Sequence, residues 1–167
     1  SGLIPFVVKN GFKGSIFCTP ATRDLCSIML PDSGRIQEVD TIQFNKKRAK
    51  QGLKPVEPIY TMRDAVQCMR HFVSIPYNLP FSITPDFTIQ FLNTGHMLGS
   101  SAVFITFKEG RRKKRLCYTG DIGRYNKAIL PDPEKFPQAD YIITESTYGD
   151  RLHTTIDQAE QDLMMVV

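Results

Sequence analysis

The chain has 167 residues, of which 41% are hydrophobic and 23% charged, and it carries a net charge of +4 at neutral pH. These values are typical of one globular domain in water with a core of its own, and no apolar run approaches the length that a membrane-spanning helix needs. The four cysteines show no CxxC spacing, and the first residues do not resemble a signal peptide. We therefore expect reduced thiols and a cytoplasmic location, and neither a disulfide framework nor a cysteine zinc knuckle.

The first 71 residues predict short helices around one strand. SIFC at 15–18 is typical of a strand, and Thr19 followed by Pro20 predicts an N-cap and the first residue of a helix that ends at Pro31. The polar, basic stretch 33–50 predicts an exposed helix and then a loop. TMRD at 61–64 resembles a capping box with Asp in place of Glu, which predicts a further helix to about residue 70.

From residue 72 onward the pattern predicts a mixed β-sheet of the strands within 72–146, with helices packed on one side. The segments 102–107 and 115–119 flank a basic turn, EGRRKKR at 109–115, and predict an antiparallel hairpin. This turn is interpreted first as a solvated hairpin tip, and alternatively as a loop that contacts phosphate. ADYIITES at 139–146 predicts a fully buried strand, and 154–167 predicts a helix.

Polar groups follow three of the predicted strands. FLNTGHMLGSS places His96 after one strand, LCYTGDIGR places Asp121 after another, and YIITESTYGDRLH places Glu145 after a third, with His153 close behind. A histidine and carboxylates suit zinc or manganese, and a further carboxylate can orient a ligand histidine. The alternatives remain that Asp121 is a turn residue and that Glu145 is a helix-capping acid.

The three motifs GHMLGSS, YTGDIGR and ITESTYGDRLH, in this order, closely resemble those of the metallo-β-lactamase-fold nucleases of the β-CASP group. That group includes ribonuclease J-like enzymes and the endonuclease subunit of the pre-mRNA 3′-end cleavage machinery. The resemblance covers nearly the whole chain and is strongest to the bacterial and archaeal RNA-processing branch. It implies an α/β fold that is part of a metallo-β-lactamase αβ/βα sandwich with a mixed β-sheet.

The resemblance also implies roles for individual residues. By carry-over, His96 and Asp121 are metal ligands, with Asp121 bridging two metal ions, and Glu145 orients a ligand histidine, so that Asp121 and Glu145 form the catalytic set. His153, which follows the third motif, is expected to contact nucleic acid; for Arg112 and Lys113 the same expectation comes from the charge of the basic turn and not from the resemblance. The implied cofactor is zinc, two ions per site in the intact parent protein, with manganese as the alternative. The implied reaction is metal-dependent hydrolysis of RNA phosphodiester bonds.

The resemblance implies that residues 1–167 are part of one metallo-β-lactamase domain, with the HxHxDH metal motif upstream and the β-CASP domain downstream both absent. We expect the parent protein to be the nuclease and this segment alone to be inactive. Two alternatives remain open: a hydrolase of small molecules on the same fold, and an inactive scaffold paralogue in an RNA-processing complex. The expected partner is RNA, and no membrane association is expected. An exposed sheet face would favour a homodimer.

Overall fold

The computed structural model describes residues 2–150 and 164–165 of the chain. Its first part contains three α-helices, one short strand and a 3-10 helix. Their bounds are Ile4–Lys9 for α1, Ile16–Cys18 for β1, Pro20–Lys50 for α2, Met62–Cys68 for α3 and Met69–His71 for the 3-10 helix.

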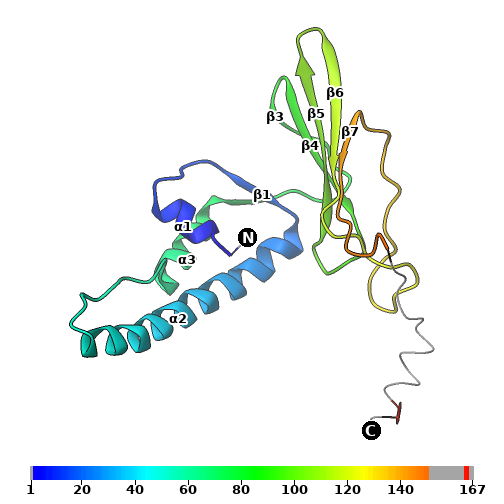
Figure 1. The fold of residues 1–167 in the computed structure, drawn as a ribbon. Coiled ribbons are helices and arrows are strands. Elements are labelled where there is room, and N and C mark those ends of the chain that lie inside the picture. The colour runs from blue at the N-terminus through cyan, green and yellow to red at the C-terminus, as the bar shows by residue number, and fades with distance from the viewer. Residues whose placement is uncertain (1, 151–163, 166–167) are drawn as a thin grey trace.

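The second part consists of strands. They are Phe72–Ser74 for β2, Phe81–Thr84 for β3, Phe87–Asn93 for β4, Ser101–Glu109 for β5, Arg112–Tyr118 for β6 and Tyr141–Ile143 for β7. Figure 1 shows the helices gathered beside the tall sheet of β3 to β7, with α2 reaching toward the lower end of that sheet.

Local hydrogen bonds explain where two of the helices begin. At the start of α2, Thr19 Oγ1 accepts a hydrogen bond from the Thr22 backbone N–H at 3.3 Å, and a proline occupies the first helical position. At the start of α3, the Thr61 N–H donates to Asp64 Oδ2 at 2.9 Å, while the Asp64 N–H donates to Thr61 Oγ1 at 3.2 Å. Both predicted helix starts are therefore confirmed, including the capping box with aspartate.

The predicted end of the first long helix is wrong, because α2 continues through Pro31. An interior proline removes one hydrogen bond and costs about 3 kcal/mol. Tertiary contacts just beyond it favour the continuous helix: the Tyr60 hydroxyl donates to Ser33 Oγ at 2.8 Å, and Gly34 packs directly on α3. A Cβ on Gly34 would lie 2.7 Å from the backbone nitrogen of Met62, so the two helices meet backbone to backbone here.

Within the described residues, the strands form two sheets rather than one. β1 and β2 pair in parallel, and the larger sheet has the order β3-β4-β5-β6-β7. Neighbours in the larger sheet are antiparallel except β6 and β7, which are parallel, so this sheet is mixed. The hairpin predicted at 102–119 is confirmed as β5 and β6. The prediction that the strand at 72–74 belongs to this sheet is wrong, because β1 takes that strand as its parallel partner.

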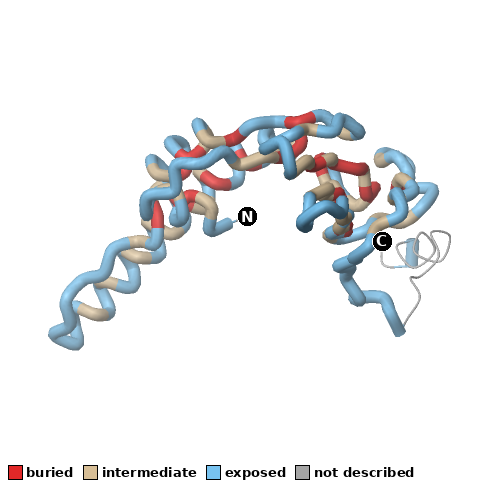
Figure 2. Tube along the Cα trace, turned by 90° about the horizontal axis from the view of Figure 1, so that it is seen from above, coloured by how far each residue is buried: buried red, intermediate tan, exposed pale blue. Residues whose placement is uncertain are grey.

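Among the described residues, buried side chains form three clusters, one among the helices and one on each face of the larger sheet. Figure 2 shows buried positions both in the helical part and in the sheet. On one face Phe104 and Cys117 pack with Phe136 from the loop before β7, and on the other Phe91 packs with aromatic side chains that include Phe17 of β1. The helices pack on each other and on the smaller sheet. They lie beside the larger sheet and do not cover one side of it as predicted.

The structure also corrects the prediction for residues 139–146. Only Tyr141–Ile143 form a strand, and all three residues are about half exposed or more. β7 is the edge strand of the described sheet, so the apolar run does not have strands on both sides. The broader prediction is confirmed: the fold is mixed α/β with a mixed β-sheet, and it is compatible with an αβ/βα sandwich.

Candidate functional site

The turn that carries His96 follows β4, and hydrogen bonds between its own side chains and its backbone stabilise it. Asn93 Oδ1 accepts the Gly95 N–H at 2.7 Å, and Gly95 has a φ of +61°, a conformation that glycine adopts without strain. Ser100 Oγ accepts the Met97 N–H at 3.1 Å and donates to the Met97 carbonyl at 2.8 Å. These bonds close the backbone into a compact turn that presents His96.

The same turn rests on the N-terminus of α2. The hydroxyls of Thr19 and Thr22 both donate to the Gly99 carbonyl, at 2.7 and 2.9 Å. A Cβ on Gly99 would lie 2.7 Å from the Thr22 backbone nitrogen, so a side chain there would push the turn off the helix. On the other side of His96, a Cβ on Gly95 would lie 2.6 Å from the Pro131 oxygen, so glycines permit a close backbone contact on each side of the histidine.

The loop after β6 carries Asp121 and lies directly against the His96 turn. The Gly123 N–H donates to the Thr94 carbonyl at 2.7 Å. A Cβ on Gly123 would lie 2.0 Å from the Gly95 oxygen and 2.5 Å from the His96 nitrogen. Farther along this loop, Lys127 Nζ donates to the His96 carbonyl at 3.0 Å. Backbone contact and a lysine thus hold the two loops together.

Glu145 follows β7 and is tied to the same loop. Its Oε1 accepts the Ile122 N–H at 2.8 Å. β4, β6 and β7 run in the same direction, so their carboxyl ends meet at one edge of the sheet and bring His96, Asp121 and Glu145 together. The bond to Ile122 makes Glu145 a residue that holds the Asp121 loop in place.

His96 and Asp121 face each other across the gap between their loops. Their closest atoms, Nε2 and Oδ2, are 3.8 Å apart, and the side chains are 38% and 69% exposed. Two donors of one tetrahedral zinc ion, each about 2.1 Å from it, are about 3.4 Å apart. The two donor atoms are therefore close to a chelating separation and reachable from solvent.

These side chains line an open cleft with a volume of about 270 Å³. Among residues 2–150, the cations Arg124 and Lys127 contribute to its wall, and each is half-buried. The described residues that line the cleft are His96, Asp121, Ile122, Gly123, Arg124, Lys127, Glu145, Thr147 and Tyr148.

The side chains in the cleft partly fit the predicted metal site. An imidazole and a carboxylate are suitable zinc or manganese ligands, but a catalytic zinc ion normally has three protein ligands. Among residues 2–150 and 164–165, no three His, Cys, Asp or Glu side chains converge into a group that could hold a metal. His96 and Asp121 fit as two ligands of such a site, and the described residues do not complete its coordination.

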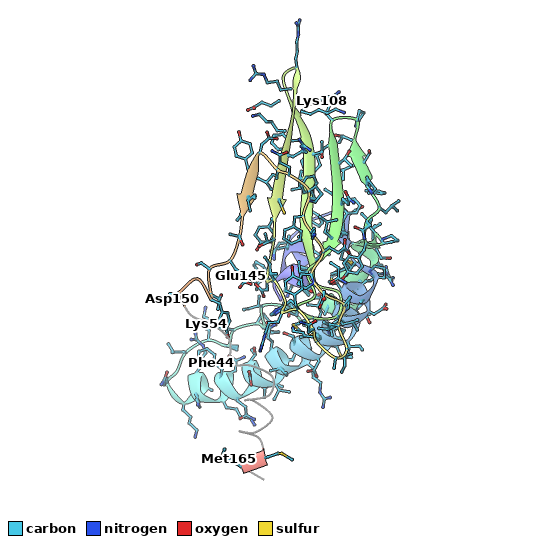
Figure 3. The ribbon with its side chains drawn as sticks, turned by 90° about the vertical axis from the view of Figure 1, so that its right-hand side faces the viewer. Phe44, Lys54, Lys108, Glu145, Asp150 and Met165 are labelled. Atoms are coloured by element: carbon cyan, nitrogen blue, oxygen red, sulfur yellow. The ribbon has the colours of Figure 1, made fainter. Side chains whose placement is uncertain are left out.

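The predicted nucleic-acid contacts lie elsewhere. Arg112 and Lys113 are at the β5–β6 turn, where Arg112 pairs with Glu109, whereas the cleft is at the other end of these strands. In Figure 3, Lys108 beside this turn and Glu145 at the cleft lie toward opposite ends of the sheet. His153 lies outside the described residues. Their roles stay predictions, and the structure does not bring Arg112 or Lys113 to the cleft.

Sequence reasoning missed the structural roles of three cleft residues. Gly123 and Arg124 belong to the quoted motif YTGDIGR, but nothing in that pattern showed that they contact the His96 loop or line its cleft. Lys127 had no sequence signal at all, because the turn that directs it depends on Asn126 with a φ of +61°.

No protein-family model matches the chain. Three archaeal proteins named transcription termination factor FttA are similar to it over almost its entire length. The proteins from Methanocaldococcus jannaschii and Methanosarcina mazei are each 32% identical over 170 residues, covering 99% of this chain. The protein from Pyrococcus abyssi is 30% identical over 171 residues, covering all of it. The chain spans about a quarter of the length of these relatives, since 24% of each is covered.

These names correct the identification made from the motifs. The resemblance predicted a fragment of a ribonuclease J-like or pre-mRNA-cleaving nuclease, whereas the similar proteins are named as transcription termination factors. The prediction of that nuclease family is therefore wrong. The structure brings His96, Asp121 and Glu145 to one edge of the sheet, but short motifs do not by themselves establish the biological role of a protein.

Proposed function

We propose that this chain belongs to a protein that acts on RNA in transcription termination, and that its cleft is part of a metal-dependent phosphodiester hydrolase site. The similarity to termination factors over nearly the whole chain supports a role in RNA processing. The single observation that supports hydrolysis is the His96–Asp121 pair, 3.8 Å apart in a cleft that also carries two cations.

In this proposal the chain's own residues have distinct tasks. His96 Nε2 and Asp121 Oδ2 would supply two ligands to a zinc or manganese ion. Glu145 keeps the Asp121 loop in place through the Ile122 N–H, and Lys127 fixes the backbone of His96. Such an ion, when bound, would neutralise the negative charge on the phosphate oxygens and promote attack of water on phosphorus.

The proposal includes partners and a location. RNA and the transcription machinery are the proposed partners, because the relatives are named for their part in transcription. The cytoplasm is the proposed location, since archaeal transcription takes place there. Across residues 2–150 and 164–165, none of the helices has the length and apolar character needed to cross a bilayer.

Asp121→Asn tests the hydrolase proposal in the natural full-length polypeptide. The amide keeps the size of the side chain but removes the charge that binds a cation. We expect the bound metal to be lost and single-turnover RNA cleavage to fall by about 10³-fold or more, since a metal ion stabilises the transition state by several kcal/mol. RNA binding should change far less, because it rests mainly on cations that contact phosphate.

Asp86→Asn is the matched control, because it makes the same chemical change at the far end of the sheet, where Asp86 pairs with Lys108. It should retain metal and cleavage. Metal content by mass spectrometry, RNA cleavage and RNA binding are measured for both variants. Cleavage by Asp121→Asn at the wild-type rate would leave Asp121 as a turn residue and favour a non-enzymatic termination factor.

A further inference from the structure

We propose that Arg124 and Lys127 form the binding site for one phosphodiester group of the RNA backbone, inside the cleft beside His96 and Asp121. This inference deepens the proposed function by assigning the substrate contact to residues that the motifs did not indicate. It rests on the cleft, on the position of both cations in its wall, and on the distance of the basic hairpin from it.

The fold of one loop brings the two cations to the same cleft. Arg124 and Lys127 are only three residues apart in the loop after β6. Between them Asn126 has a φ of +61°, and its N–H donates to Asp132 Oδ1 at 2.7 Å. The backbone therefore turns between Arg124 and Lys127, and both side chains line the cleft.

Lys127 is fixed and retains donors for a ligand. Its Nζ donates to the His96 carbonyl at 3.0 Å, which places the ammonium group beside the proposed metal ligand. An ammonium group has three N–H donors, and the bond to His96 uses one of them. Because the side chain is half-buried, its charge is less screened by water than that of a fully exposed lysine.

The charges in the cleft require such cations if an RNA phosphate is to enter. Asp121 is an acid that would repel the phosphate, and Glu145 adds a second negative charge. Arg124 and Lys127 offset these two charges. An arginine can donate two parallel N–H bonds to phosphate oxygens, and a lysine adds a compact positive charge. The pair therefore suits a phosphodiester, which carries a single negative charge and two unesterified oxygens.

The basic hairpin cannot hold the same phosphate. From Ser101 at the cleft end to Glu109 at the turn, β5 advances eight residues, or about 26 Å at the usual rise of a strand. Arg112 and Lys113 beyond this turn are exposed. They can contact a distant part of a long RNA, but the group nearest His96 and Asp121 depends on Arg124 and Lys127.

The test compares two double variants of the 167-residue chain that lose the same charge. The cleft variant is Arg124→Gln with Lys127→Met, and the hairpin variant is Arg112→Gln with Lys113→Met. Binding of a fluorescein-labelled RNA of about 20 nucleotides is measured in EDTA at several salt concentrations. Because the cleft is proposed to hold one phosphate, the cleft variant should reduce the magnitude of the slope of log affinity against log salt by about 0.7. EDTA removes metal, so the result does not depend on hydrolysis.

The diribonucleotide UpU, which has one phosphodiester, distinguishes binding at the cleft from binding at the basic hairpin, because it is too short to reach both. It is titrated into the isotope-labelled chain, and the backbone amide signals of Gly95 and Gly123 are followed. We expect these signals to shift in the wild type and the hairpin variant but not in the cleft variant. Arg124→Lys with Lys127→Arg should restore the shifts in part, because both charges return without the original geometry.

The inference is overturned if UpU shifts the cleft signals equally in the wild type and the cleft variant, or shifts them in neither. Unfolding of the cleft variant is detected by its amide spectrum, and Arg124→Gln alone then provides the comparison, because the bond from Lys127 to His96 is kept. The outcome is separate from that of the hydrolase proposal. If the cleft variant loses UpU while Asp121→Asn still cleaves, the phosphate site stands and the metal-site assignment falls.

Discussion

Gly123→Ala tests whether backbone contact sets the position of His96. The added Cβ would lie 2.0 Å from the Gly95 oxygen, 2.2 Å from its carbonyl carbon and 2.5 Å from the His96 nitrogen. All three atoms belong to backbone, so rotation of a side chain cannot relieve the collision. The two loops must move apart by about 1 Å or more to reach ordinary contact distance.

Two consequences follow from this separation. The 2.7 Å bond from the Gly123 N–H to the Thr94 carbonyl breaks or lengthens, which together with overpacking should lower the free energy of unfolding by about 1–3 kcal/mol. His96 also moves relative to Asp121. A displacement of about 1 Å in a catalytic constellation can cost about 10²-fold in rate, and we expect a loss of this order in single-turnover RNA cleavage.

Gly120→Ala is the control in the same loop. Gly120 has a φ of +56°, so alanine there should cost about 1–2 kcal/mol of stability. Its Cβ would meet only Ser101 O at 3.5 Å, an ordinary contact, so His96 should stay in place. Thermal unfolding and cleavage of the natural full-length protein are measured for both variants. The reasoning is refuted if Gly123→Ala cleaves as fast as the wild type, or if Gly120→Ala loses as much activity at comparable stability.

Two further predictions concern stability and thiol chemistry. The hydrogen bond from the Thr61 N–H keeps the pKa of the Asp64 carboxyl below its usual value. The ionised carboxylate therefore stabilises the folded state fully above the unfolded pKa near 4, and this stabilisation is lost as the pH falls through the lower folded pKa. Asp64→Ala should therefore lower the free energy of unfolding by about 1 kcal/mol at pH 7 and by less in acid. Denaturant titrations of both proteins measure this, and an equal loss of stability at pH 2–3 and at pH 7 would contradict it. Burial raises the pKa of Cys18 and of Cys68 to about 11, so at pH 8 about one thiol in a thousand is ionised at each. Iodoacetamide should modify these two cysteines only after unfolding, and rapid labelling of the native chain in peptide mass spectra would contradict their burial.

Local signals in the sequence were enough for several elements. Thr19 with Pro20 and Thr61 with Asp64 determine helix starts, because a cap satisfies backbone donors within three residues of itself. The β5–β6 hairpin was also predictable, since its strands are joined by a short turn. The gathering of His96, Asp121 and Glu145 followed from polar residues placed after strands, although their chemical roles stay predictions.

Tertiary structure decided what no local pattern could. Pro31 sits inside a continuous helix because Ser33 and Gly34 pack on residues about 27 positions later, and β2 pairs with β1 across more than fifty residues. Arg124 and Lys127 line the cleft, and Gly123 contacts the backbone of His96, because the loops after β4 and β6 pack against each other. Helix caps and hairpins depend on neighbours along the chain, whereas strand partners, proline tolerance and cleft walls depend on contacts between segments that the sequence separates.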